Sequence, residues 1–101
     1  MIKVKYELKG DRYHSINVSG HAQYADKGQD LFCSAVSSIM FGFMNALDAL
    51  NENIDIKQLT NEIKVVNKSD SGIVQNYFEL VMIQLKTIEE SYGDFIKLER
   101  K

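Results

Sequence analysis

The sequence predicts an α+β fold, a two-layer sandwich in which two main helices cover one face of a mostly antiparallel sheet. Two patterns predict this fold. Apolar and polar residues alternate in several short stretches, which is typical of strands with one buried face. Two longer stretches have apolar residues spaced by three and four, which is typical of helices with one buried face. Packing such helices on such a sheet buries both apolar surfaces together.

In the first part of the chain the pattern predicts a hairpin followed by a loop. A first strand is predicted by apolar residues that alternate with charged ones, namely Ile2, Val4, Tyr6 and Leu8. Turn-forming residues at 9–12 and a second alternating run over 13–19 predict the hairpin. Residues 20–29 contain two glycines and few large apolar side chains, and we interpret them as a loop.

The remaining elements follow in the order helix, strands, helix and strand. The spacing of apolar residues predicts a first helix over 31–50. Short alternating stretches within residues 54–67 predict strands. A second helix is predicted over 73–92, and Gly93 is suited to the C′ position that ends a helix. Residues 95–98 predict a last short strand.

Length and composition indicate a single domain over residues 1–101. One compact domain typically has about this size, and 45 % apolar with 26 % charged residues is close to the globular average. No proline or Gly/Ser-rich linker marks a boundary. No run of about 18 apolar residues is present and the N-terminus alternates, so we expect a cytoplasmic protein that contacts no membrane. A net charge of −2 and a pI near 5.6 argue against nucleic-acid binding.

Cys33 is the first candidate for covalent chemistry. As the single cysteine it excludes an internal disulfide and a cysteine-cluster zinc site. Asp30 is expected at the N-cap of the first helix, which places Cys33 in the first turn, where the helix dipole favours a thiolate. Free cysteines are also often buried as small apolar side chains, so the position alone does not decide between the two roles.

A possible partner for this thiol is His21. It begins the predicted loop directly after Gly20, and such a loop can return to the start of the helix, although a single loop histidine is more often a solvated side chain. Asp30, Cys33 and Ser37 are spaced by three and four, so they share one face of a helix. Together with His21 they suggest a Cys–His nucleophile with polar support.

The other histidine and the metal alternative carry less weight. His14 has the strand parity of Ile16 and Val18, and we expect a structural role for it. A metal site could use both histidines with Asp30 and Cys33, but their spacing matches no known ligand pattern. We therefore expect neither a metal nor a cofactor.

Two segments, 20–22 and 28–37, resemble the signature of the ribosomal-processing cysteine proteases, a bacterial family. The family pattern is approximately G-H-A, a short loop, and then G-x-D-x-x-C-A-A-V-S. This sequence reads G-H-A and G-Q-D-L-F-C-S-A-V-S in the same order and at the same spacing. Ser34 departs from the family, which usually has alanine there.

The resemblance implies an endopeptidase that removes the N-terminal extension of large ribosomal subunit protein twenty-seven. Members of the family look like homodimers and cut after a short apolar segment that ends in phenylalanines. The resemblance further implies that Cys33 is the nucleophile, that His21 is the general base, and that Asp30 and Ser37 support them. Gly20, together with Gly28, would then flank a loop that closes over the substrate.

Two other functions remain open at this point. A noncatalytic ribosome-associated binding module could have the same fold without the activity. A small thiol redox protein is the third reading, and it is weakened by the absence of a C-x-x-C pair, which leaves no resolving cysteine in the chain.

Overall fold

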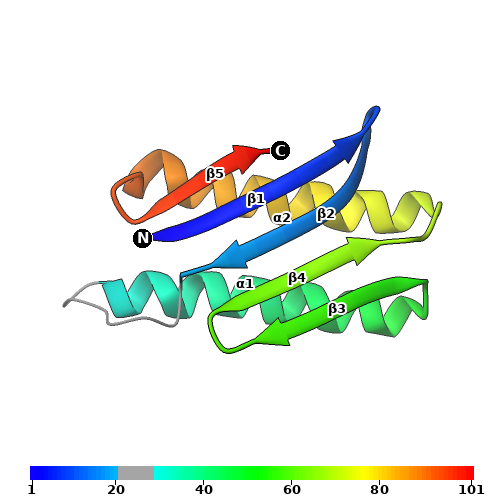
Figure 1. Ribbon diagram of the computed structural model, residues 1–101, viewed down its shortest axis with the longest axis horizontal. Helices are drawn as coiled ribbons and strands as arrows, with labels where there is room; N and C mark the ends of the chain where they lie inside the picture. The colour runs from blue at the N-terminus through cyan, green and yellow to red at the C-terminus, as the bar shows by residue number, and fades with distance from the viewer. Residues whose placement is uncertain (21–28) are drawn as a thin grey trace.

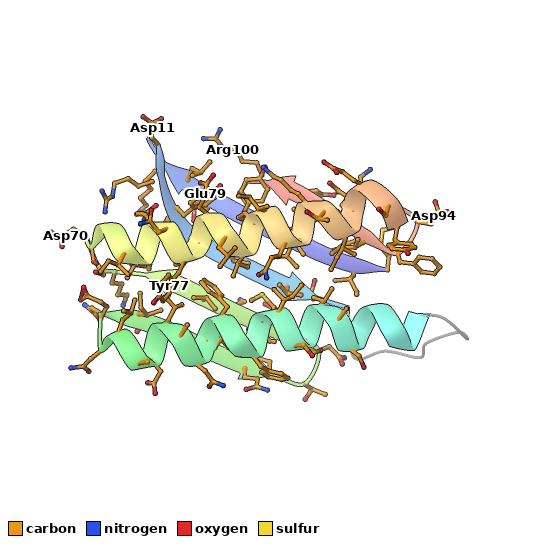
Figure 2. All side chains as sticks on the ribbon, turned by 180° about the vertical axis from the view of Figure 1, so that it is seen from behind. Asp11, Asp70, Tyr77, Glu79, Asp94 and Arg100 are labelled. Atoms are coloured by element: carbon orange, nitrogen blue, oxygen red, sulfur yellow. The ribbon has the colours of Figure 1, made fainter. Side chains whose placement is uncertain are left out.

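The described part of the chain forms one five-stranded sheet and two helices (Figure 1). The structure is a computed structural model that describes residues 1–20 and 29–101, and for residues 29–33 it describes the backbone only. The elements in chain order are β1 (Ile2–Lys9), β2 (Arg12–Ser19), α1 (Gln29–Leu50), β3 (Ile54–Leu59), β4 (Glu62–Asn67), α2 (Gly72–Tyr92) and β5 (Ile96–Arg100). Both helices lie on the same face of the sheet (Figures 1 and 2), so the predicted two-layer α+β fold is confirmed.

The strand order in the sheet is β3-β4-β2-β1-β5. The pairs β1–β2, β2–β4 and β3–β4 are antiparallel, whereas β1 and β5 run parallel. Both hairpins have short turns, and Gly10 in the first turn has a φ of 62°, which a residue without a side chain adopts at little cost. Helix α2 carries the chain back across the sheet, so that β5 can pair with β1 in the parallel direction.

The core fills the space between the sheet and the helices. Its buried apolar side chains come from β1, β2, β4, β5 and both helices, and include Ile2, Val4, Ile16, Val18, Val36, Met40, Phe43, Leu47, Ile63, Val65, Val74, Phe78, Val81, Leu85 and Ile96. Phe78 lies near the centre, with the ring of Phe43 edge-on at 5.0 Å and the ring of Tyr13 stacked at 6.1 Å. The apolar stripes that predicted the two helices therefore face the sheet.

A β-bulge interrupts the alternation of β2. Ser15 pairs with Glu7 but Tyr13 pairs with Leu8, so two steps along β2 oppose one step along β1, and His14 is the extra residue. Tyr13 then packs against the core, while His14 borders the polar surface beside β4. The expected alternation from His14 into the core-facing residues of β2 is wrong for this reason.

The boundaries of the helices differ from the expected ones. Helix α1 begins at Gln29, two residues earlier than predicted, so Asp30 lies inside the first turn and is not the N-cap. Helix α2 begins at Gly72, after Ser71. Gly93 ends α2 with a φ of −60°, which is right-handed, so the left-handed C′ conformation is absent there.

The side chain of Gln75 on α2 binds the backbone of Tyr13 beside the bulge, where β2 is not paired with β4. Its Oε1 atom accepts a hydrogen bond from the backbone N–H of Tyr13 at 2.6 Å, and its Nε2 atom donates to the carbonyl of the same residue at 2.9 Å. Asn67 donates a further hydrogen bond to that carbonyl at 3.3 Å. Both backbone groups of Tyr13 are therefore satisfied by side chains from distant parts of the chain.

We expect Gln75→Ala to lower the free energy of unfolding by about 1–3 kcal/mol, because it leaves the partly buried N–H and carbonyl of Tyr13 with fewer partners. Urea unfolding followed by circular dichroism measures this change. Gln58→Ala, a change at an exposed glutamine on the edge strand β3, is the matched control and should stay within about 0.5 kcal/mol of the wild type. Equal stability of the two variants would contradict the prediction.

At the other end of β2, Gly20 occupies a position that only glycine fits. Its φ is 82°, and a Cβ atom built there would lie 2.5 Å from the carbonyl oxygen of Met1. Its N–H donates a hydrogen bond of 3.1 Å to the carbonyl of Asn61 in the turn between β3 and β4. The chain is therefore held between the start of β1 and the β3–β4 turn where it leaves the sheet.

Gly20→Ala should destabilise the protein more than Gly10→Ala. Both glycines have a positive φ, which costs a residue with a Cβ atom roughly 1–2 kcal/mol, but nothing lies within 4 Å of a Cβ atom at Gly10. At Gly20 the backbone of Met1 has to move as well. The midpoints of urea unfolding compare the two variants, and a smaller loss for Gly20→Ala would show that this close approach does not matter.

Candidate active site

Helix α1 positions two of the candidate residues through its backbone. Asp30 is the second and Cys33 the fifth residue of α1, so Cys33 lies at the beginning of the second turn, two residues further in than expected. The backbone N–H groups of a helical first turn have no partners within the helix, and they give this end a partial positive charge. A thiolate near this end is favoured electrostatically.

The structure describes some of the candidate residues and not others. His21 and Gly28 lie outside the described residues, and so does any contact of the Cys33 and Asp30 side chains. The pairing of His21 with Cys33 therefore stays a prediction. Ser37 lies within α1, half-buried, four residues after Cys33 and on the same side of the helix.

This side of α1 points away from α2. Buried residues such as Val36 and Met40 face the sheet, and Ser38 with Gly42 lines a groove against α2. At 100° per residue, positions 33 and 37 lie on the opposite flank of the helix, toward the β3 edge of the sheet.

The fold brings the last residues of β2 and the first residues of α1 to the same end of the molecule, as Figure 1 shows. Gly20, the residue before His21, is fixed there by Met1 and Asn61. The structure therefore places the residue before the candidate base and the helix start before the candidate nucleophile at one end of the fold. A loop hinge at Gly20 stays a prediction.

A charged cluster on the uncovered face of the sheet lies close to this end. Glu62 follows the β3–β4 turn, and its carboxylate accepts hydrogen bonds from Lys64 at 3.2 Å and Asn17 at 3.1 Å. The hydrogen bond from Lys64, and then that from Asn17, lowers the pKa of Glu62 below its ordinary value. This carboxylate therefore stays ionised at neutral pH and neutralises the charge of Lys64.

A groove of about 410 Å³ runs between the two helices on their outer side. Gly42 and Ala46 leave it open on α1, while Tyr77 and Leu80 border it on α2. Figure 2 shows Tyr77 between the two helices. The groove is mainly apolar, and it was not expected from the sequence.

Some exposed apolar residues were also missed because the sequence pattern groups only those that share the buried stripe. Phe41, Leu80 and Ile83 fall outside the stripes of their helices and are exposed in the structure. That mismatch between a large apolar side chain and the helical period is the signal that could have found them.

The described residues offer no alternative metal centre or membrane segment. Within residues 1–20 and 29–101, no three His, Cys, Asp or Glu side chains gather as metal ligands would. In the same part of the chain, neither helix has the length and apolar character needed to cross a membrane.

Comparison with known proteins connects these features to one family. The model of the family described as cysteine protease Prp matches residues 1–97. The ribosomal processing cysteine protease Prp of Mycoplasma pneumoniae is 36 % identical over 92 residues, which cover 86 % of this chain and 87 % of that protein.

Solved structures give the same result for the fold. The essential ribosomal processing protease Prp of Staphylococcus aureus, in complex with a substrate peptide, has a TM-score of 0.93 at 25 % identity and covers the whole of both chains. Its complex with a covalently linked product peptide has a TM-score of 0.88 at 26 % identity, again over both whole chains. With the family match over residues 1–97, these relatives show that the chain belongs to the family of the cysteine protease Prp.

Proposed function

We propose that this cysteine protease removes the N-terminal extension of large ribosomal subunit protein twenty-seven, with Cys33 as nucleophile and His21 as general base. One observation carries the assignment of the nucleophile: a cysteine protease needs a reactive thiol, and Cys33 is the only cysteine in the chain. The covalently linked product peptide in the Staphylococcus aureus relative supports covalent catalysis. The relatives named as ribosomal processing proteases support a ribosomal protein as substrate.

The proposed reaction uses the start of α1 and the residues around it. His21 takes the proton of Cys33, and the thiolate attacks the scissile carbonyl. Unpartnered N–H groups of a helix start can hold the developing oxyanion, which is typically worth roughly 3–4 kcal/mol per donor. The protonated imidazole gives its proton to the leaving amine, and water then hydrolyses the thioester.

Asp30 and Ser37 act as supporting residues in this proposal. A carboxylate at Asp30 opposes the thiolate electrostatically, so its benefit comes from orientation or from contact with the protonated His21. Gly20 and Gly28 flank the loop that carries His21, and closure of this loop over the substrate would complete the site.

We also propose a domain organisation, a cofactor requirement and a location for the enzyme. Residues 1–101 act as one protease domain, and the Cys–His chemistry uses no metal or cofactor. The substrate is a ribosomal protein precursor, so the enzyme works in the cytoplasm, where ribosomes are assembled.

We further propose that the enzyme is a homodimer joined through the outer side of its helices. Leu80 and Ile83 are 56 % and 53 % exposed there, beside the groove that Gly42 and Ala46 leave open. In a two-fold dimer, the exposed side chains of Leu80 and Ile83 on each protomer can pack into the groove of its partner. Helices of 22 and 21 residues give a face of about 33 × 20 Å, comparable with the roughly 800 Å² that each partner buries in a stable interface.

Replacing Cys33 tests the catalytic proposal. Cys33→Ala and Cys33→Ser should abolish cleavage of the extended ribosomal protein and keep the fold, because the reaction has no other thiol. Mass spectrometry identifies the new N-terminus, and circular dichroism checks the fold. Full cleavage after stoichiometric alkylation of Cys33 would refute the proposal, and no cleavage by wild-type enzyme would favour a noncatalytic binding module.

The two histidines provide a matched pair for the general base. His21→Ala should lower kcat/KM by about 10²–10⁴-fold, the usual cost of losing a general base. His14→Ala, at the bulge in β2, should stay within a few-fold of the wild type. Similar values of kcat/KM for both variants at neutral pH would show that His21 is not the base.

A charge on the helix face tests the dimer. Leu80→Asp and Ile83→Asp should each convert the protein to monomers at micromolar concentration, because a carboxylate would be buried without a partner. Asn53→Asp adds the same charge in the exposed turn after α1 and should leave the dimer intact. Sedimentation equilibrium measures the mass, and dimers of all three variants would place the interface elsewhere.

A further inference from the structure

Charge is distributed unequally between the two layers of the fold. The five strands carry eight basic and four acidic residues, whereas the two helices carry one basic and five acidic residues. The net charge of −2, which argues against nucleic-acid binding for the chain as a whole, is therefore an average over a basic sheet and acidic helices. A local field of one sign can attract a partner that the total charge would repel.

Most of the basic residues of the sheet lie on the face that the two helices do not cover, which is the face turned to the viewer in Figure 1. Ile2, Val4, Ile63 and Ile96 are buried beneath the helices, so their neighbours along each strand point the other way. Lys57 shares that other face because it pairs with Lys64. The exposed lysines on this face include Lys3, Lys5, Lys57, Lys64 and Lys97.

Four of these lysines form two pairs that lie directly opposite each other in the sheet. Lys57 on β3 pairs with Lys64 on β4, and Lys3 on β1 pairs with Lys97 on β5. Like charges at directly opposite positions destabilise a sheet. The carboxylate of Glu62 neutralises Lys64 at 3.2 Å. Within the described residues Lys3, Lys57 and Lys97 form no ion pair, so an anionic partner would remove a repulsion that the fold leaves in place.

The lysines extend across the whole width of the sheet. Lys57 and Lys97 lie on the two edge strands, and Lys5 lies between them on β1. Five strands whose neighbours are about 4.8 Å apart give a width of about 19 Å. A nucleic-acid duplex carries about one negative charge per 1.7 Å of its axis, so a face of this width meets several phosphates at once.

The composition of this face favours a phosphate backbone over an acidic protein as the partner. The core of a protein interface is depleted in lysine and enriched in aromatic residues. In the described strands Tyr6 and Tyr13 are the only Phe, Tyr or Trp residues, and both pack against the core on the other side. Leu59, at the end of β3, is the one exposed large apolar residue of these strands on this face. Without such rings to stack on bases, lysines contact the backbone of a duplex and read no sequence.

We propose that this lysine face, formed by Lys3, Lys5, Lys57, Lys64 and Lys97, binds the phosphate backbone of double-stranded RNA without reading its sequence. The choice of RNA rests on the proposed function, because a ribosomal protein is assembled on RNA. The lysine face and the helices lie on opposite sides of the sheet, so RNA bound there does not cover α1 (Figures 1 and 2). The enzyme would thus be held beside a substrate that is already on its RNA.

Fluorescence anisotropy of a short labelled RNA duplex measures this binding. The wild type should bind with a micromolar Kd at about 50 mM salt, and its affinity should fall about 100-fold by about 200 mM salt, as four phosphate contacts predict. Four single variants should each weaken binding and lower the slope of log Kd against log salt by about one, namely Lys3→Gln, Lys5→Gln, Lys57→Gln and Lys97→Gln. Urea unfolding should find Lys57→Gln at least as stable as the wild type, since the change removes the repulsion from Lys64.

Lys86→Gln is the matched control, because it removes the same charge from the exposed side of α2. It should leave the affinity and the salt dependence unchanged. An equal loss of binding in Lys86→Gln, or no binding by the wild type at about 50 mM salt, would overturn the proposal. Competition by polyglutamate as strong as that by RNA would make an acidic protein the partner, and tighter binding of a DNA duplex of the same sequence would make DNA the partner. Either result would also overturn it.

Cleavage measurements separate this proposal from the proposed function. One substrate peptide is joined to the RNA duplex, and a second is joined to a neutral spacer of the same length. The wild type should cleave the RNA-joined peptide with a KM at least about 10-fold lower and with the same kcat, and the variant with all four glutamines should lose this difference. If neither peptide is cleaved, the proposed function fails while the anisotropy still tests RNA binding. Equal KM values of the wild type for both peptides would overturn the role of the lysine face.

Discussion

The apolar layer between the sheet and its helices is the constraint on which the rest of the structure depends. In the part of the chain that the structure describes, both helices cover the same face of the sheet, so α1 and α2 bury their stripes against the same strands. Val36, Met40 and Leu47 anchor α1 along most of its length. Packing against the sheet therefore positions α1 from Val36 onward.

The candidate site combines a rigid part with a part that lies beyond the described residues. Its rigid part is the backbone of α1 and the end of β2. At the end of β2, Gly20 lies against Met1, and its N–H donates a hydrogen bond to Asn61 in the β3–β4 turn. Three separate segments of the chain thus define the point from which the residues around His21 depart.

The sequence predicted the elements that depend on local periodicity and missed those that depend on distant partners. The stripes of both helices predicted their buried faces, because period and burial have the same cause. The bulge at His14 was not predicted, and the backbone of Tyr13 beside it hydrogen-bonds Gln75, 62 residues further along the chain. Helix α1 begins before Asp30, so a residue suited to capping does not by itself fix a helix end.

For the candidate site, the resemblance of the motif to a known family predicted more than the spacing of the residues did. Spacing alone put Asp30, Cys33 and Ser37 on one face, but only the resemblance gave them roles, and the comparisons confirm the family and not the roles. Phe41 was overlooked because the stripe analysis retained residues that face the core. Exposure is a tertiary property, which the helical period of the sequence does not give.

The parallel pairing of β1 with β5 has a consequence for the order of folding. Ile2 pairs with Ile96, and the N–H of Ile2 donates to the carbonyl of Phe95, so one edge of β1 gains its partner strand only when the last strand arrives. Contacts between residues so distant in sequence form slowly. The close approach of Met1 to Gly20 belongs instead to the hairpin of β1 and β2, so this part of the scaffold needs only residues that are near in sequence, whereas the outer edge of β1 stays open until β5 has been synthesised.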